Sequence, residues 1–239
     1  MTTTNPAATA PASPAAEPQR YYGFSALVSG FAKMWRATVP AILFIVLNAL
    51  VQAGLISSNP QVGWTAAFLL PLITSVVMFV LTGVVLASGA YESAAGPARF
   101  GAVLGRARSR FVRFLIWVAI ATVIATAAAL VNPVLSIIVT WVLVYVPIAA
   151  VDDQGNPFVA NFRAIGRHPF RWFFTGIIIA VFLAVGFLLG AFNTFLVGGP
   201  FGSLLAMLVG GVFSWWFLTT WACLFRSRSG EATGEVAAK

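Results

Sequence analysis

Six long apolar stretches run along this chain, and the loops that join them are alternately basic and uncharged. Each stretch is close to the ~20 residues that a helix needs to cross a hydrocarbon core ~30 Å thick. Such a pattern is typical of a polytopic membrane protein and predicts an all-α bundle of six transmembrane helices. The stretches lie near residues 38–56, 62–88, 114–131, 134–151, 172–192 and 202–225.

The composition favours a bilayer over water as the solvent of this chain. Hydrophobic residues make up 60% of the sequence and charged residues 8%, whereas a soluble domain carries about 25% charged residues. The net charge of +8 could indicate nucleic-acid binding. Because the basic residues flank apolar spans, however, we expect anionic lipid headgroups and not nucleic acid as their counter-charge.

The distribution of basic residues predicts the orientation in the membrane. The loops after the first, third and fifth stretches carry no charge, and the positive-inside rule places such loops outside the cell. Both termini are then cytoplasmic, and the excess of arginine over lysine favours the plasma membrane of a bacterium. The basic residues predicted to contact lipid headgroups are Lys33, Arg36, Arg106, Arg108, Arg110, Arg113, Arg163, Arg167 and Arg171.

We divide the chain into a terminal tail, a membrane domain and a second short tail. Residues 1–20 are rich in Pro, Ala and Thr and have almost no large apolar side chain, so they are predicted to be disordered and cytoplasmic. They lack the basic start and apolar core of a signal peptide. Residues 21–228 form the predicted six-helix domain, and residues 229–239 form a short cytoplasmic tail.

Three amphipathic segments resemble one another, at residues 24–36, 100–113 and 158–171. Each opens with Phe, has Ala two residues on, and ends in a basic residue where an apolar span begins. We expect three units, each an interfacial helix followed by a transmembrane hairpin. The alternative is ordinary basic juxtamembrane loops of similar composition. The apolar faces are Phe24, Leu27, Val28, Phe31, Met34 and Trp35; Phe100, Val103, Leu104, Ala107 and Phe111; and Phe158, Phe162 and Ile165.

The third segment also carries a family resemblance. Its residues Pro157, Phe158, Ala164, Ile165, Gly166, Pro169, Phe170 and Arg171 lead into an apolar hairpin. Over roughly residues 24–225 the chain resembles small bacterial six-helix proteins, which are similar to the non-catalytic membrane domain of glycerophosphodiester phosphodiesterases. In that family a separate soluble domain performs catalysis. The resemblance therefore implies the membrane part without the enzyme, and no catalytic residue is carried over.

Chemistry-bearing residues are sparse. No ionisable residue lies in the middle of a predicted span, which argues against a proton-coupled transporter or an intramembrane protease. Asp152 and Asp153 could bind a divalent metal, but no third acidic ligand is near. No phosphate-binding loop or nucleophile elbow is present. We predict that the protein is not an enzyme, with no catalytic residue, cofactor or metal.

Polar and small residues within the spans have two interpretations each. Asn48 and Gln52 are four residues apart and share a helix face; they either line a path for a ligand or bond neighbouring helices, and we favour the second. Small residues four apart predict close helix packing, either inside the monomer, which we favour, or on a dimer face. The predicted packing residues are Gly186, Gly190, Gly202, Ala206, Gly210 and Ser214.

These observations favour a non-enzymatic scaffold or accessory subunit of a membrane assembly, with a membrane-protein partner or a second copy of the chain. The alternative is a protein that handles lipids or small solutes and binds anionic headgroups at the cytoplasmic leaflet. The cluster Arg106, Arg108, Arg110 and Arg113 favours this alternative.

Overall fold

The computed structural model describes residues 24–58, 65–153, 155–167, 169–196 and 199–236, so the predicted disordered tail, residues 1–20, lies outside the described part. Every regular element in these ranges is helical, which confirms the all-α class. The elements are α1 (Phe24–Met34), the 3₁₀ turn η1 (Trp35–Ala37), α2 (Thr38–Ser57), α3 (Ala66–Ala95), α4 (Phe100–Val131), α5 (Pro133–Val142), α6 (Val146–Val151), α7 (Pro157–Arg167), α8 (Pro169–Leu196) and α9 (Gly199–Val236).

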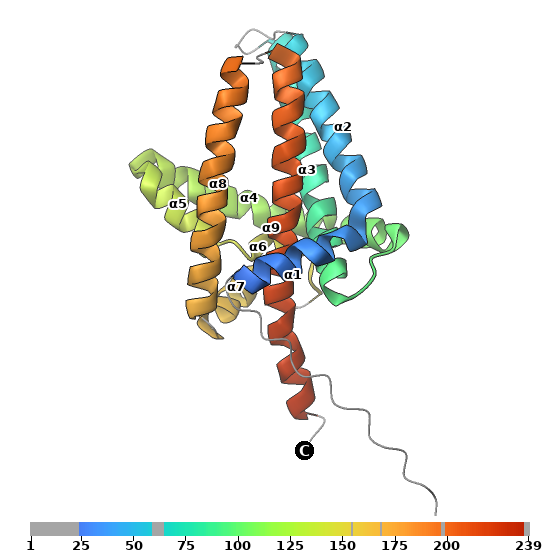
Figure 1. Cartoon of the computed structure of the whole chain (residues 1–239), viewed down its shortest axis with the longest axis vertical. Helices are drawn as coiled ribbons and strands as arrows, with labels where there is room; N and C mark the ends of the chain where they lie inside the picture. The colour runs from blue at the N-terminus through green and yellow to red at the C-terminus, as the bar shows by residue number, and fades with distance from the viewer. Residues whose placement is uncertain (1–23, 59–64, 154, 168, 197–198, 237–239) are drawn as a thin grey trace, which may run out of the picture.

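The long helices α2, α3, α8 and α9 run along the longest axis of the molecule, and α9 packs against α2, α3 and α8 (Figure 1). By length and composition, five described helices could cross a membrane: α2 with α1 leading into it, α3, α4, α8 and α9. The exact number of six crossings stays a prediction. Helix α9 continues to Val236, past the boundary predicted at residue 228.

Helix α1 lies across the bundle and turns through η1 into α2 (Figure 1). Leu27 and Met34 are fully buried, and the indole of Trp216 on α9 donates a hydrogen bond to the Leu27 carbonyl at 2.9 Å. The predicted apolar face of this segment is therefore divided between the bundle and the outside. Its exposed members are Phe24, Val28, Phe31 and Trp35.

The second predicted unit differs from the first, because α4 is one continuous helix with no turn between its basic and apolar halves. It crosses α8 and α9 at a steep angle, and α5 returns beside it (Figure 1). We call residues 114–142 the α4–α5 wing. The Asn132-Pro133 junction at its tip is confirmed as a helix start: the Asn132 side chain accepts a hydrogen bond from the Val134 amide at 2.8 Å, and Pro133 opens α5.

The prediction of a single helix over residues 134–151 is wrong. Helix α5 ends at Val142, a turn follows at residues 143–145, and α6 begins at Val146. Pro147, expected to kink this span, lies in the first turn of α6. A proline lacks an amide donor and clashes with the carbonyl four residues earlier, so it is accommodated where one helix stops and another starts.

The interpretation of Asn48 and Gln52 as interhelical bonding groups is supported. Gln52 donates to the Asn48 side chain at 3.2 Å and to the Ser75 carbonyl on α3 at 3.3 Å. In return, the Ser75 hydroxyl donates to the Gln52 side chain at 2.8 Å. These bonds join α2 to α3 inside the apolar part of the bundle, where no water competes for them.

Close helix approach occurs at glycines other than most of those predicted. A Cβ atom at Gly211 on α9 would lie 2.6 Å from Ile45 on α2, whereas at Gly186 and Gly210 it would meet no atom within 4 Å. No close helix approach occurs at Gly186 or Gly210, and the packing role proposed for these residues stays a prediction. Of the other predicted positions, Gly202 is buried, Ala206 is half-buried and Ser214 is exposed, while the surroundings of Gly190 lie outside the described residues.

The neighbouring glycines 210 and 211 allow a matched test. We expect Gly211→Ala to destabilise the protein by about 1–3 kcal/mol, because the added methyl overpacks the contact with Ile45. Gly210→Ala should leave stability unchanged or raise it by up to about 1 kcal/mol through helix propensity. Thermal unfolding in a mild detergent measures both. Equal effects of the two changes would contradict the packing of α2 on α9.

The wing tip ends short of the level that the far ends of α2 and α8 reach (Figure 1). We expect Val131→Cys, in a Cys223→Ser background, to react slowly with a membrane-impermeant maleimide added to intact cells. Ser58→Cys, at the exposed end of α2, is the control and should react rapidly. Equally rapid labelling at both positions would instead establish a full crossing by the wing and support the predicted six spans.

Candidate functional site

A cavity of about 660 Å³ lies between the α4–α5 wing on one side and helices α8 and α9 on the other. Its walls are mainly apolar, from Val118 and Ala125 on α4 to Leu183 on α8 and Phe217 and Trp221 on α9. A second cavity, of about 270 Å³, shares part of this lining and continues between α5 and α8. The size is that of typical small-molecule sites, about 300–1,000 Å³.

The cavity also contains hydroxyl groups. Thr122 satisfies its own hydroxyl by donating to the Val118 carbonyl at 2.8 Å, as threonines in apolar helices commonly do. The other hydroxyls make no hydrogen bond within the described part of the chain: Thr126 on α4, Ser136 and Thr140 on α5, and Ser214 on α9. No charged side chain is among the described residues that line the cavity.

The break between α5 and α6 forms one end of this cavity, through Leu143, Val144 and Pro147. The break frees backbone groups that a continuous helix would pair. Asn161 of α7, which is fully buried, pairs two of them: its amide donates to the Val142 carbonyl at 2.9 Å, and its oxygen accepts from the Tyr145 amide at 3.0 Å. Irregular backbone at membrane depth is tolerated where protein satisfies it in this way.

Sequence reasoning missed Asn161. Phe158, Phe162 and Ile165 were predicted as the apolar face of an interfacial helix, and Phe162 is exposed. The buried residues are Pro157, Asn161 and Ala164. Their spacing of four and then three residues is the signal of a helix face, and it was available in the sequence.

Where α5 meets α8, Gly176 allows close contact. A Cβ at this position would overlap the indole of Trp141, whose ring stacks on Phe173 at 5.7 Å between centroids. The Trp141 indole nitrogen is buried and has no hydrogen-bond partner in the described residues. This packing fixes the distance between the wing and α8, and hence the width of the smaller cavity.

Arginines of α4 cap the C-terminal end of α6 and the loop that follows it. Arg106 donates to Glu92 at 2.5 Å and to the Val151 carbonyl at 3.1 Å, and Arg113 donates to the Gly155 carbonyl at 2.6 Å. A cation at a helix C-terminus is favoured by the helix dipole and by the unpaired carbonyls. The basic half of α4 is thereby attached to α3 and to the segment after the break.

The carboxylates considered as metal ligands belong to the same network. Asp153 pairs with Arg110, and the Tyr91 hydroxyl donates to the buried Asp152 at 2.7 Å. The guanidinium groups of Arg106 and Arg226 lie 4.5 and 4.4 Å from the centroid of the Tyr91 ring, within cation–π distance. Within the described ranges, no group of three Asp, Glu, His or Cys residues is placed to hold a metal ion.

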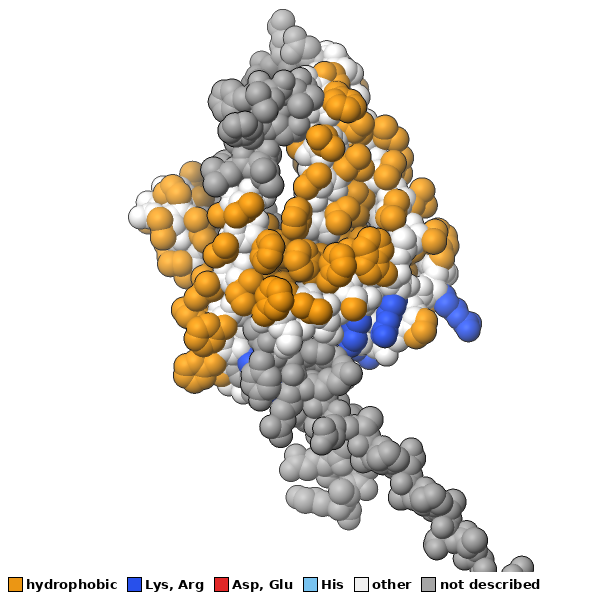
Figure 2. All heavy atoms as spheres, in the orientation of Figure 1, with side chains coloured by type: hydrophobic (Ala, Val, Ile, Leu, Met, Phe, Trp, Pro, Cys, Tyr) orange, Lys and Arg blue, Asp and Glu red, His pale blue; other side chains and the backbone are white. Residues whose placement is uncertain are grey.

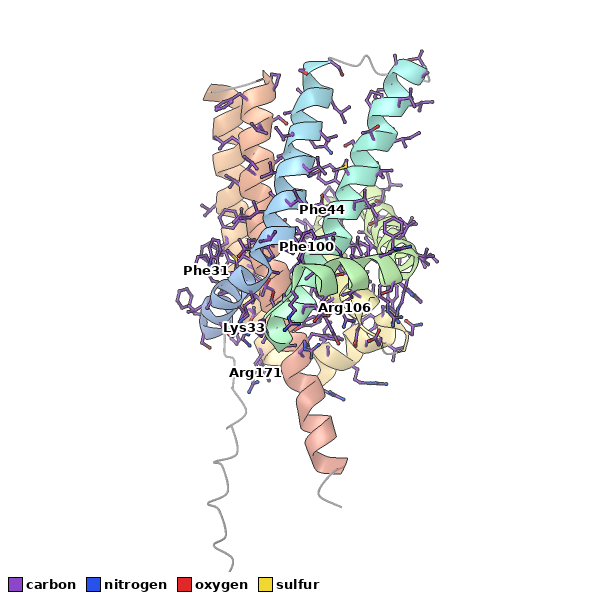
Figure 3. All side chains as sticks on the ribbon, turned by 90° about the vertical axis from the view of Figure 1, so that its right-hand side faces the viewer. Phe31, Lys33, Phe44, Phe100, Arg106 and Arg171 are labelled. Atoms are coloured by element: carbon purple, nitrogen blue, oxygen red, sulfur yellow. The ribbon has the colours of Figure 1, made fainter. Side chains whose placement is uncertain are left out.

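The residues predicted to contact lipid headgroups lie toward one end of the bundle, as the labelled Lys33, Arg106 and Arg171 show (Figure 3). Several of them also bond within the chain: Arg106, Arg110 and Arg113 as above, and Arg36 to the Ser93 carbonyl at 3.3 Å. Lys33, Arg167 and Arg171 also interact with groups of the chain. Arg108 and Arg163 are exposed and have no such contact within the described ranges. Headgroup contact stays a prediction for all nine residues.

Comparison with known proteins gives no relative: no family model, curated protein or solved structure matches this chain. The likeness to phosphodiesterase membrane domains therefore stays a prediction.

Asn161 allows a test of the broken helix. We expect Asn161→Leu to destabilise the protein by about 2–4 kcal/mol, because two buried backbone groups lose their partners. Asn156→Ala is the control, since it removes only the exposed cap of α7, at about 1 kcal/mol. Thermal unfolding in detergent measures both. A loss no larger for Asn161→Leu than for the control would mean that the break does not depend on this side chain.

Proposed function

We propose that this chain is a non-enzymatic, lipid-handling membrane protein that holds the hydrocarbon chain of a lipid between the α4–α5 wing and helices α8 and α9. The observation that carries the proposal is the 660 Å³ cavity with its mainly apolar walls. Such walls exclude ions and strongly polar solutes, because nothing compensates the loss of their hydration. The apolar walls match the hydrocarbon chains of membrane lipids.

The break between α5 and α6 supports the same proposal. Interrupted helices at membrane depth are typical of substrate sites, where a turn replaces regular backbone and exposes groups to a ligand. Here the turn residues Leu143 and Val144 themselves line the cavity. A change in the angle between α5 and α6 would alter the shape of the cavity directly.

We further propose a bacterial plasma-membrane location with the basic end of the bundle and both termini in the cytoplasm. The positive-inside rule motivates this orientation. The face seen in Figure 2 is consistent with it, since apolar side chains cover most of the described surface and its basic side chains gather toward one end. The exposed aromatic residues Phe24 and Phe31 of α1 and Trp35 of η1 would then lie at the cytoplasmic membrane interface.

The role of scaffold or accessory subunit, favoured from the sequence, stays a prediction and differs from lipid handling in what accompanies the protein. An accessory subunit would be purified with a stoichiometric protein partner. A lipid-handling protein would be purified with lipid retained beyond the annular shell.

Ala125 and Ala127 provide the test of the cavity. Ala125 on α4 lines the cavity, whereas Ala127, two residues on, is exposed and does not line it. We expect Ala125→Trp to fill the space and lower the lipid that remains bound after delipidation by about tenfold. Ala127→Trp should retain the wild-type amount. Mass spectrometry of the intact protein from mild detergent measures the bound lipid, and thermal unfolding verifies that both variants fold.

Equal lipid retention by the two variants would overturn the proposal. A stoichiometric protein partner, with no lipid lost on filling the cavity, would restore the accessory-subunit hypothesis.

A further inference from the structure

We infer that the ligand of this cavity is a neutral lipid: a long hydrocarbon chain that bears an uncharged hydrogen-bonding group, either a hydroxyl or an ester. The inference rests on the proposed function and specifies its substrate class. It also departs from the expectation that anionic headgroups are what this protein recognises.

Four hydroxyl groups in the cavity lining are unpaired within the described chain. The hydroxyls that line the cavity without a hydrogen-bond partner in the described residues come from the three helices α4, α5 and α9: Thr126, Ser136, Thr140 and Ser214. In an apolar helix a threonine readily bonds the carbonyl one turn earlier, as Thr122 does in the same cavity. Hydroxyls that forgo this bond in apolar surroundings are paired when a ligand supplies the partner.

The hydroxyl groups are spaced one helical turn apart on both helices of the wing. Thr126 lies one turn beyond Thr122 on α4, and Ser136 and Thr140 lie one turn apart on α5. Positions four apart share a helix face, so both helices of the wing present hydroxyls to the same space. Each hydroxyl both donates and accepts. This suits a ligand hydroxyl, which also donates and accepts, and an ester carbonyl, which accepts only.

The described lining of the cavity offers no counter-charge to an ionised ligand. The described lining has no charged residue. The α4 arginines closest in sequence, Arg110 and Arg113, are bonded to Asp153 and to the Gly155 carbonyl on the loop after α6. A phosphate or carboxylate inside the cavity would therefore be buried without a counter-ion, which is strongly unfavourable at low dielectric. A charged lipid is rejected by the same walls that accept a neutral one.

The experiment compares two photoactivatable probes on the full chain in nanodiscs of zwitterionic lipid. One is a long-chain alcohol and the other the carboxylate of the same chain length, each with a diazirine on the chain, at a pH where the carboxylate is ionised. We expect the alcohol to label peptides of α4, α5 and α9 roughly tenfold more than the carboxylate. Excess unlabelled long-chain alcohol should abolish this labelling. This comparison requires no variant.

Isosteric variants then identify the hydroxyls. Thr126→Val and Thr140→Val should each lower labelling by the alcohol roughly three- to tenfold, the range of one lost hydrogen bond. Thr74→Val is the control, because Thr74 lies on α3 outside the cavity lining and its hydroxyl is already paired with the Leu70 carbonyl; this change should alter labelling less than twofold. Thermal unfolding in the same nanodiscs confirms that all variants are folded.

The outcomes separate the two proposals. Equal labelling by alcohol and carboxylate, or no effect of Thr126→Val and Thr140→Val, overturns the neutral-lipid inference. If Ala125→Trp nevertheless abolishes labelling, lipid binding in the cavity stands without it. If Ala125→Trp leaves labelling of these helices unchanged, both the inference and the proposed function fail.

Discussion

The constraint on which this structure depends is that backbone groups at membrane depth need partners inside the protein. Most of the chain meets it with uninterrupted helices. Between Val142 and Val146 the helix stops, and there the buried side chain of Asn161 pairs the Val142 carbonyl and the Tyr145 amide. The short helix α6 that follows has its end capped by arginines of α4. The interruption between α5 and α6 is thus compensated by α7 and α4, two helices that also carry basic residues.

The cavity adjoins that interruption, since Leu143, Val144 and Pro147 line one end of it. Because α5 ends early and α4 crosses the bundle steeply, the wing does not pack along α8 and α9 as a regular hairpin would (Figure 1). Close contact is confined to places such as Gly176, where the backbone of α8 admits the indole of Trp141. Farther along, the facing surfaces separate and leave the space lined by Thr126, Thr140 and Ser214. The break after Val142 and the steep crossing of α4 therefore both help to shape the site.

Part of this fold could be predicted from the sequence, and part could not. Hydropathy placed α2 well, because its ends coincide with changes between polar and apolar residues. The start of α5 was predictable because Asn132 and Pro133 are residue types that begin helices. The break after Val142 was not predicted, because hydropathy is continuous across the break. The residue that stabilises the break, Asn161, is distant in sequence. Gly210 was predicted as the packing residue in place of Gly211 for a similar reason. A four-residue repeat shows that one helix face carries small side chains, but the crossing of α2 and α9 decides which face is in contact.

The hydroxyls of the cavity illustrate the same limit on the functional side. In sequence, Thr122, Thr126, Thr140 and Ser214 are equivalent polar residues in apolar spans, and interhelical bonding is the simplest role for all of them. In the fold, Asn48, Gln52 and Ser75 do perform that role, whereas Thr122 bonds its own helix and the others bond nothing in the described chain. Polar residues of the same kind thus differ in whether their side chains are bonded inside the protein. This difference depends on where the fold places their helices. Because Arg106, Arg110 and Arg113 are bonded within the chain and do not line the cavity, the neutral-lipid proposal rests on the unpaired hydroxyls of the lining and on the shape of the cavity.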